Sequence, residues 1–146
     1  MKMKKLICVM TLVCIGILLV SCRSNRLGDP KAQLMRDFAL NIEKKDCVLE
    51  ELLNNYEGVP YEGIALYKLT VGEDVRQAFL QWERFPLPEA AEHFLESLSA
   101  YVELPSIADG YWKMVDRNPG TSAYTNVSLC VYDGATGAAY LLTMDI

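Results

Sequence analysis

The sequence has little of the residue chemistry that common metal and catalytic sites use. It contains a single histidine, His93, so a metal site built from several imidazoles is excluded. It has neither the Lys-Ser/Thr ending of a P-loop nor the Gly-x-Ser-x-Gly turn of many hydrolases. No segment has the alternating oxygen ligands of a calcium-binding loop. We therefore expect no metal, no cofactor and no enzymatic activity.

Basic residues are also scarce. Fourteen Lys and Arg stand against 19 Asp and Glu, which gives a net charge of −5. Nucleic-acid binding requires a basic surface that neutralises phosphates, so the acidic balance argues against a nucleic-acid partner. With about half of its 146 residues apolar, the chain instead fits a globular domain.

The first 21 residues differ in composition from the rest. Lys2, Lys4 and Lys5 precede an apolar segment over residues 6–20. This segment is shorter than the roughly 20 residues that a membrane-spanning helix needs. A cationic start followed by a short apolar segment is typical of an export signal.

The end of this segment, Leu19-Val20-Ser21-Cys22, resembles the lipobox of bacterial lipoproteins. The resemblance covers residues 1–22 only. It implies that Cys22 carries a diacylglyceryl group, that cleavage falls before Cys22, and that the new amino group is often acylated. Two or three acyl chains anchor a protein stably to a membrane, whereas one chain does so only marginally.

The same resemblance favours a location in the bacterial cell envelope. In lipoproteins of enteric-type bacteria an aspartate after the cysteine retains the protein in the inner membrane, and Arg23 stands here instead. The outer membrane is therefore favoured, with the domain facing the periplasm, or the outer surface in a single-membrane bacterium. A plain secretory signal and an uncleaved anchor are two other interpretations, and both place the remaining chain outside the cytoplasm.

Cleavage after residue 21 would change both the charge and the organisation of the chain. It removes three lysines and no acid, which lowers the net charge from −5 to −8. Residues 22–29 then form a short polar tether, and residues 30–146 are expected to form one globular domain.

Cleavage and lipidation also leave only two cysteines, Cys47 and Cys130. A pair of cysteines in an oxidising compartment is a candidate disulfide, and two free thiols are the alternative. A helical Cys47 would lie on the polar side of its helix, and Cys130 falls on the more polar face of a predicted strand. Both alternatives therefore stay open.

A long first helix is predicted over residues 30–56. Asp29 and Pro30 form a typical helix start, and Gly58 and Pro60 follow its end. Asp37 is placed on the charged side of this helix. An interruption around residues 44–46, where polarity is highest, is the alternative. The predicted apolar side consists of Leu34, Phe38, Ile42, Leu49, Leu52, Leu53 and Tyr56.

The remaining elements predict an α+β fold. Apolar periodicity and turn residues indicate a strand over residues 61–71, a short helix over 73–82, a helix over 88–105, and strands over 111–116, 124–132 and 138–145. The expected order is α-β-α-α-β-β-β. We expect about three helices packed on one face of a small antiparallel sheet.

Two features are candidates for contact with a partner. Glu89, Glu92 and Glu96 form an acidic face on the helix predicted over residues 88–105, and His93 shares this solvated side. Tyr111 and Trp112 follow a turn, where aromatic residues often bind partners. A strand directs these two aromatic side chains to opposite faces.

These features lead to a functional hypothesis. A small, acidic, lipid-anchored domain without catalytic motifs is expected to be a non-catalytic protein-binding module, of the immunity, exclusion or assembly type. Its expected partners are the membrane, through Cys22, and a protein of unknown identity. The alternatives are a structural accessory of an envelope machine and a carboxylate-dependent hydrolase.

Overall fold

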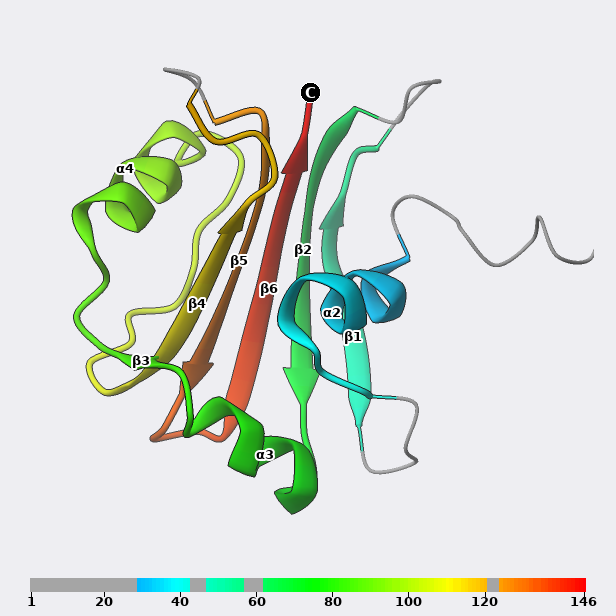
Figure 1. Ribbon diagram of the computed structural model, residues 1–146, viewed down its shortest axis with the longest axis vertical. Coiled ribbons are helices and arrows are strands. Elements are labelled where there is room, and N and C mark those ends of the chain that lie inside the picture. The colour runs from blue at the N-terminus through cyan, green and yellow to red at the C-terminus, as the bar shows by residue number, and fades with distance from the viewer. Residues whose placement is uncertain (1–28, 43–46, 57–61, 121–123) are drawn as a thin grey trace, which may run out of the picture.

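The computed structural model describes residues 29–42, 47–56, 62–120 and 124–146 (Figure 1). The predicted signal peptide, Cys22 and most of the tether lie outside these residues. Within them, no helix has both the length and the apolar character needed to cross a membrane. The elements in chain order are α2 (Pro30–Phe38), β1 (Val48–Asn54), β2 (Gly63–Thr70), α3 (Glu73–Phe79), β3 (Glu83–Arg84), α4 (Glu89–Ser97), β4 (Gly110–Asp116), β5 (Asn126–Asp133) and β6 (Ala138–Asp145).

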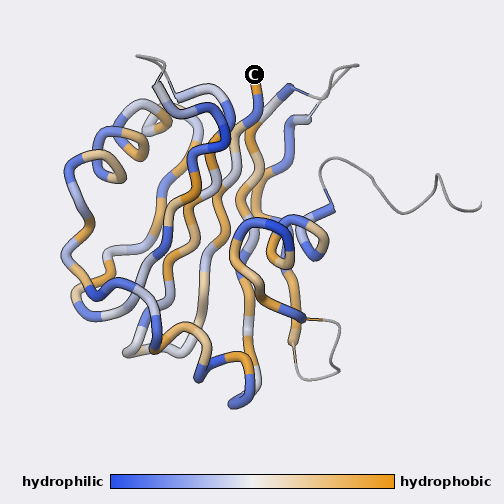
Figure 2. The backbone as a smooth tube through the Cα atoms, in the orientation of Figure 1, coloured by the Kyte–Doolittle hydropathy of each residue, from blue (hydrophilic) through white to orange (hydrophobic). Residues whose placement is uncertain are grey.

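The strands form one six-stranded sheet in the order β1-β2-β6-β5-β4-β3. Every neighbouring pair is antiparallel. Figure 2 shows that hydrophobic residues concentrate along the central strands. The predicted α+β class, with three helices and an antiparallel sheet in the described residues, is confirmed. The predicted element order is wrong, because β1 and the two-residue β3 were not anticipated.

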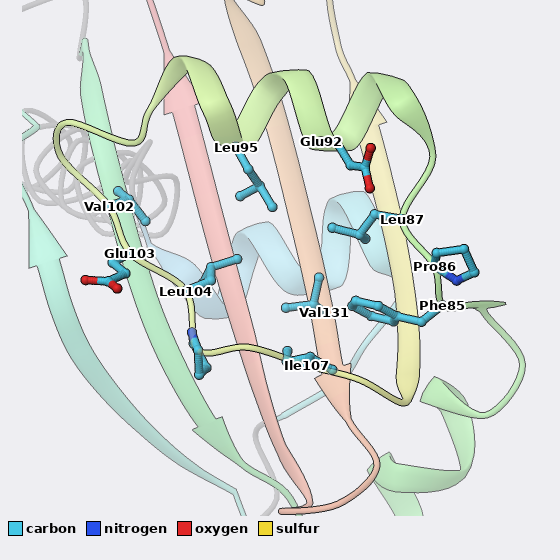
Figure 3. A pocket seen from close by; sticks show the side chains of 11 residues that line it. Phe85, Pro86, Leu87, Glu92, Leu95, Val102, Glu103, Leu104, Ile107 and Val131 are labelled. Carbon is cyan, nitrogen blue, oxygen red and sulfur yellow. The ribbon is translucent and has the colours of Figure 1, made fainter.

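Both faces of the sheet are covered, which corrects the prediction that the helices share one face. Along β5, Val127, Leu129 and Val131 pack toward α4, whereas Cys130 and Tyr132 pack toward α2 and α3. Figure 3 shows α4 in front of the sheet and α2 behind it. A strand that is buried on both faces has apolar residues at nearly all of its positions. Its sequence pattern therefore does not indicate which face is exposed to solvent.

The first helix is much shorter than predicted. It ends at Phe38 because Ala39 adopts a left-handed conformation, with φ 57° and ψ 29°. The backbone N–H groups of Ala39 and Leu40 donate to the carbonyls of Met35 and Leu34 at 3.1 Å each, which closes the helix end. The prediction of an interruption around residues 44–46 falls on residues outside the described part of the chain.

Residues 48–54 form the edge strand β1 and not the end of a helix. Leu49 pairs with Leu69 of β2, and Leu53 pairs with Leu66 after an irregularity at Leu52. The irregularity directs Leu49 and Leu53 to opposite sides of the sheet, where each contacts a core cluster. The four-residue spacing of Leu49 and Leu53 fits a helix equally well. The pairing with β2 therefore determines that this segment is a strand.

The last helix also ends earlier than predicted, at Ser97. Phe94 and Leu98 are buried as the apolar spacing predicts. The same spacing predicts a buried Tyr101, yet Tyr101 is 66% exposed because the helix ends at Ser97, before the chain reaches it.

Of the two alternatives for the described cysteines, the structure has the two free thiols, Cys47 and Cys130. Cys47 directly precedes β1, and Cys130 lies on β5. The strands β2 and β6 separate β1 from β5. At about 4.8 Å between neighbouring strands, three steps span about 14 Å, whereas bridged Cα atoms lie within about 7 Å.

Candidate functional site

A cavity of about 460 Å³ opens on the α4 side of the sheet (Figure 3). Its size falls in the range of roughly 300–1,000 Å³ that is usual for ligand pockets. Val131 of β5 forms its floor, α4 lies above it, and the chain segments before and after α4 form its sides. Its lining is mainly apolar and consists of Phe85, Pro86, Leu87, Glu92, Leu95, Val102, Glu103, Leu104, Pro105, Ile107 and Val131.

The helix above the cavity is fixed by its buried face. Pro88 precedes the first turn in an extended conformation, which suits a residue before a helix. Ala91 and Phe94 are fully buried against the sheet. Tyr124 contacts the Phe94 ring edge-on, and its hydroxyl donates to the Ala90 carbonyl at 2.9 Å. These contacts leave Leu95 directed into the cavity, as Figure 3 shows.

The wall formed by residues 85–87 is attached to β4. The Phe85 N–H donates to the Gly110 carbonyl at 3.0 Å, and the Trp112 indole N–H donates to the Arg84 carbonyl at 3.3 Å. Gly110 has no room for a side chain, because a Cβ atom would lie 2.0 Å from the Tyr132 carbonyl oxygen. The close approach of the backbones of β4 and β5 at Gly110 therefore helps to place this wall.

The two charged residues that line the cavity are both acidic. Residues 85–112 include five acids and no Lys or Arg. Two of these acids, Glu92 and Glu103, line the cavity and are exposed. An anionic rim around an apolar interior attracts a ligand that is cationic at its edge and apolar at its centre.

The structure brings together only part of the predicted contact surface. Glu89, Glu92 and Glu96 are exposed on α4, and only Glu92 lines the cavity. His93 is exposed as predicted, with its Nε2 3.9 Å from a Glu89 carboxylate oxygen.

The two aromatic residues of β4 are half-buried and do not line the cavity. Tyr111 packs against the cluster of α2 and α3, and Trp112 packs against the cluster of α4. The prediction that they face opposite sides is confirmed, and both contribute to packing. Trp112 supports the cavity wall through its hydrogen bond to Arg84.

Sequence reasoning missed the apolar residues that line the cavity. The apolar spacing of the helix predicted over residues 88–105 indicates a core position for Leu95, and Phe85 and Leu87 lie between two predicted helices. No sequence pattern indicated that Leu104 and Ile107 line a site. The available signal was the combination of a proline-rich apolar segment with an absence of basic residues over positions 85–112.

A polar cluster lies on the side of the sheet opposite to the cavity, where α2 meets β5 and β6. An Arg117 NH1 group donates to Asp37 at 2.7 Å, and its NH2 group pairs with Asp145. Asp145 also accepts a hydrogen bond from the Tyr56 hydroxyl at 2.8 Å. The prediction that Asp37 lies on a charged outer side is wrong, because its side chain is 3% exposed.

Ser128 completes this cluster. Its hydroxyl donates to Asp37 at 2.7 Å and accepts from the Gln33 amide at 2.9 Å and from Arg117. One donor and two acceptor positions are all that a hydroxyl offers, so Ser128 is fully satisfied. The cluster holds α2 on the sheet and does not line the cavity.

The protonation state of Asp37 follows from its partners. Burial by itself would raise the pKa of the Asp37 carboxyl, but hydrogen bonds from Arg36 and Ser128 and the charge of Arg117 outweigh it and lower this pKa. Asp37 is therefore an ionised structural partner. A general acid requires a proton that it can give up near neutral pH.

The described residues contain no group of three or more His, Cys, Asp or Glu side chains placed to hold a metal ion. Comparisons of the chain with protein-family models, with curated proteins and with solved structures gave no match.

Proposed function

We propose that this protein is a non-catalytic, lipid-anchored binding module of the bacterial envelope. In this proposal the cavity beneath α4 receives a bulky apolar side chain of a partner protein, and Lys or Arg residues beside that side chain face Glu92 and Glu103. The observation that carries the proposal is an apolar cavity whose lining, apart from Val131, comes from residues 85–107. This part of the chain has acids and no Lys or Arg.

The two parts of this surface make different contributions to binding. Full burial of a Leu or Phe side chain contributes about 1.5–3 kcal/mol, so the cavity supplies affinity. Exposed carboxylates contribute little to affinity individually, but they accelerate encounter with a basic partner and disfavour an acidic one.

The anchor limits where a partner is met. Residues 22–28 span at most about 23 Å at ~3.3 Å per residue, so a domain tethered at Cys22 stays close to its membrane. A Cys22→Ala variant should move from the detergent phase to the aqueous phase after phase separation. Mass spectrometry would distinguish the released form from an unprocessed precursor that still carries residues 1–21.

Photo-crosslinking in cells tests the binding proposal. A photoreactive amino acid at Glu103, on the cavity rim, should give a discrete adduct with an envelope protein. The matched control position is Glu73 on α3, an exposed acid outside the α4 layer. Substitution of Leu95→Ser should remove the Glu103 adduct while the melting curve shows a folded protein.

The identity of the adduct is part of this test. The crosslinked segment of the partner should contain Lys or Arg beside a large apolar residue. Identical adducts from Glu103 and Glu73, or an adduct that survives Leu95→Ser, would overturn the proposal.

A further inference from the structure

A second apolar pocket lies beside the C-terminal half of α4. Its volume is about 760 Å³. Ile64, Leu98, Met144 and the exposed ring of Tyr101 contribute apolar surface, and Glu62 adds a carboxylate. It therefore repeats the chemistry of the first cavity, an apolar interior with acid at its edge.

The helix α4 separates the two pockets. Glu92 and Leu95 line the first cavity, whereas Ser97 and Leu98 line the second pocket. At 100° per residue these two pairs of side chains point in directions roughly 140° apart around the helix axis. The pockets therefore lie on different sides of one helix.

The outer surface of α4, between the two pockets, is acidic. Glu89, Glu92 and Glu96 project from it and are exposed, and no Lys or Arg lies within residues 85–112. A chain that passes from one pocket to the other over the outside of α4 meets these carboxylates on the way. Along such a path the protein surface is first apolar, then acidic, then apolar again.

We propose that a single partner segment occupies both pockets and crosses α4 between them. The segment carries two bulky apolar side chains with Lys or Arg residues between them. This inference rests on the proposed function, and it adds the second pocket and the spacing of the two apolar anchors.

The width of α4 determines that spacing. A helix with its side chains is about 10–12 Å in diameter, so the outer path between the pockets, roughly 220° around the axis, is about 19–23 Å long. An extended chain covers this path in about six or seven residues at ~3.3 Å per residue. Linking two anchors across this distance makes the second contact intramolecular, which raises affinity without changing either pocket.

Three fluorescein-labelled peptides test the inference against the full chain in detergent. The peptide KWKKGKKWK has two tryptophans six positions apart, KWKKGKKGK retains one, and EWEEGEEWE reverses the charge. Fluorescence anisotropy should show that the two-anchor peptide binds at least tenfold more tightly than the one-anchor peptide. The acidic peptide should not bind.

Three variants assign the contacts. Tyr101→Ser should reduce the affinity of the two-anchor peptide to that of the one-anchor peptide and leave the one-anchor peptide unchanged. Leu104→Ser, in the first cavity, should weaken both peptides. Glu92→Gln combined with Glu96→Gln should weaken both, whereas the matched pair Glu50→Gln and Glu51→Gln, on exposed β1 positions, should not.

The outcomes separate this inference from the proposed function. Equal affinities for the one-anchor and two-anchor peptides, or no effect of Tyr101→Ser, would overturn the second pocket as an anchor while the first cavity keeps its role. If Tyr101→Ser alone abolished binding, the second pocket and not the first cavity would be the main anchor site. This result would contradict the proposed function. Binding by neither basic peptide would overturn both.

Discussion

Arg117, which directly follows β4, donates a hydrogen bond to Asp37 of α2 across 80 residues of sequence, at 2.7 Å. Asp37 is 3% exposed, and the same guanidinium pairs with Asp145 on β6. One arginine therefore connects the first described helix to the last strand. Its two carboxylate partners come from opposite ends of the described chain.

Removal of the Asp37 carboxylate should destabilise the protein. In Asp37→Ala, Arg117 keeps Asp145 but loses a buried charge-assisted hydrogen bond, and Ser128 loses its acceptor. We expect the free energy of unfolding to fall by about 2–4 kcal/mol, measured by urea denaturation. The matched control Glu50→Ala, at an exposed position, should change it by less than about 0.5 kcal/mol.

The Asp37 interactions should also give the protein a defined acid sensitivity. The pKa of Asp37 is lower in the folded protein than its ordinary value of 3.8, so the unfolded chain binds the proton more tightly. This contribution to stability is fully present above the ordinary value and is lost as pH falls through the folded pKa.

The comparison with Asp37→Asn isolates this effect. Between pH 7 and pH 5 the difference in unfolding free energy between wild type and Asp37→Asn should be constant, and below about pH 4 it should shrink. The pKa of Asp133 is also lowered, by its hydrogen bond from Thr136, but it titrates in both proteins and cancels in the difference. A difference that grows toward low pH would contradict this assignment.

Gly110 should tolerate no side chain. The Cβ of Gly110→Ala would meet the Tyr132 carbonyl oxygen at 2.0 Å, so the backbones of β4 and β5 must separate. We expect a loss of about 1–3 kcal/mol in stability, measured by thermal or urea unfolding. Binding at the cavity should weaken too, since Phe85 is hydrogen-bonded to Gly110.

Gly134→Ala is the matched control for Gly110→Ala. Its Cβ would lie 3.3 Å from the nearest backbone oxygen, that of Asp109, so a shift of a few tenths of an ångström relieves the contact. An equal loss of stability in both variants would show that the close approach at Gly110 is not the cause.

The two described cysteines should differ in reactivity. Cys130 is fully buried, and burial raises the pKa of its thiol well above the ordinary value, so little thiolate is present. Cys47 is half-buried. Iodoacetamide should therefore modify Cys47 in the folded protein and Cys130 only after unfolding.

Mass spectrometry of peptides from the oxidised, unreduced protein provides the second readout on these cysteines. No peptide pair linked through Cys47 and Cys130 should be found, because β2 and β6 separate their strands. Detection of that pair in folded protein would contradict the observed strand order.

Much of the secondary structure followed from local patterns. Residues 61–71, 124–132 and 138–145 were predicted as strands, and β2, β5 and β6 lie within or close to these limits. The short helix that begins at Glu73 and the start of α4 after Pro88 were also predicted correctly. Turn residues and clear periodicity mark these elements, so distant contacts were not needed to recognise them.

The candidate site was predicted only in part. The sequence was sufficient to indicate the acidic face of Glu89, Glu92 and Glu96, because it depends on helical spacing alone. The cavity depends on how residues 85–87 and 102–107 fold back over Val131. No local pattern encodes that contact between segments.

The sequence by itself determined the acidic balance, the α+β class and the apolar segment that ends in the lipobox-like residues before Cys22. Only the tertiary structure decided that residues 48–54 pair with β2, that Asp37 is buried against Arg117, and that helices cover both faces of the sheet. The first group depends on composition and on neighbours in the chain. The second depends on pairings between distant segments, whose burial and hydrogen bonds outweigh local preference.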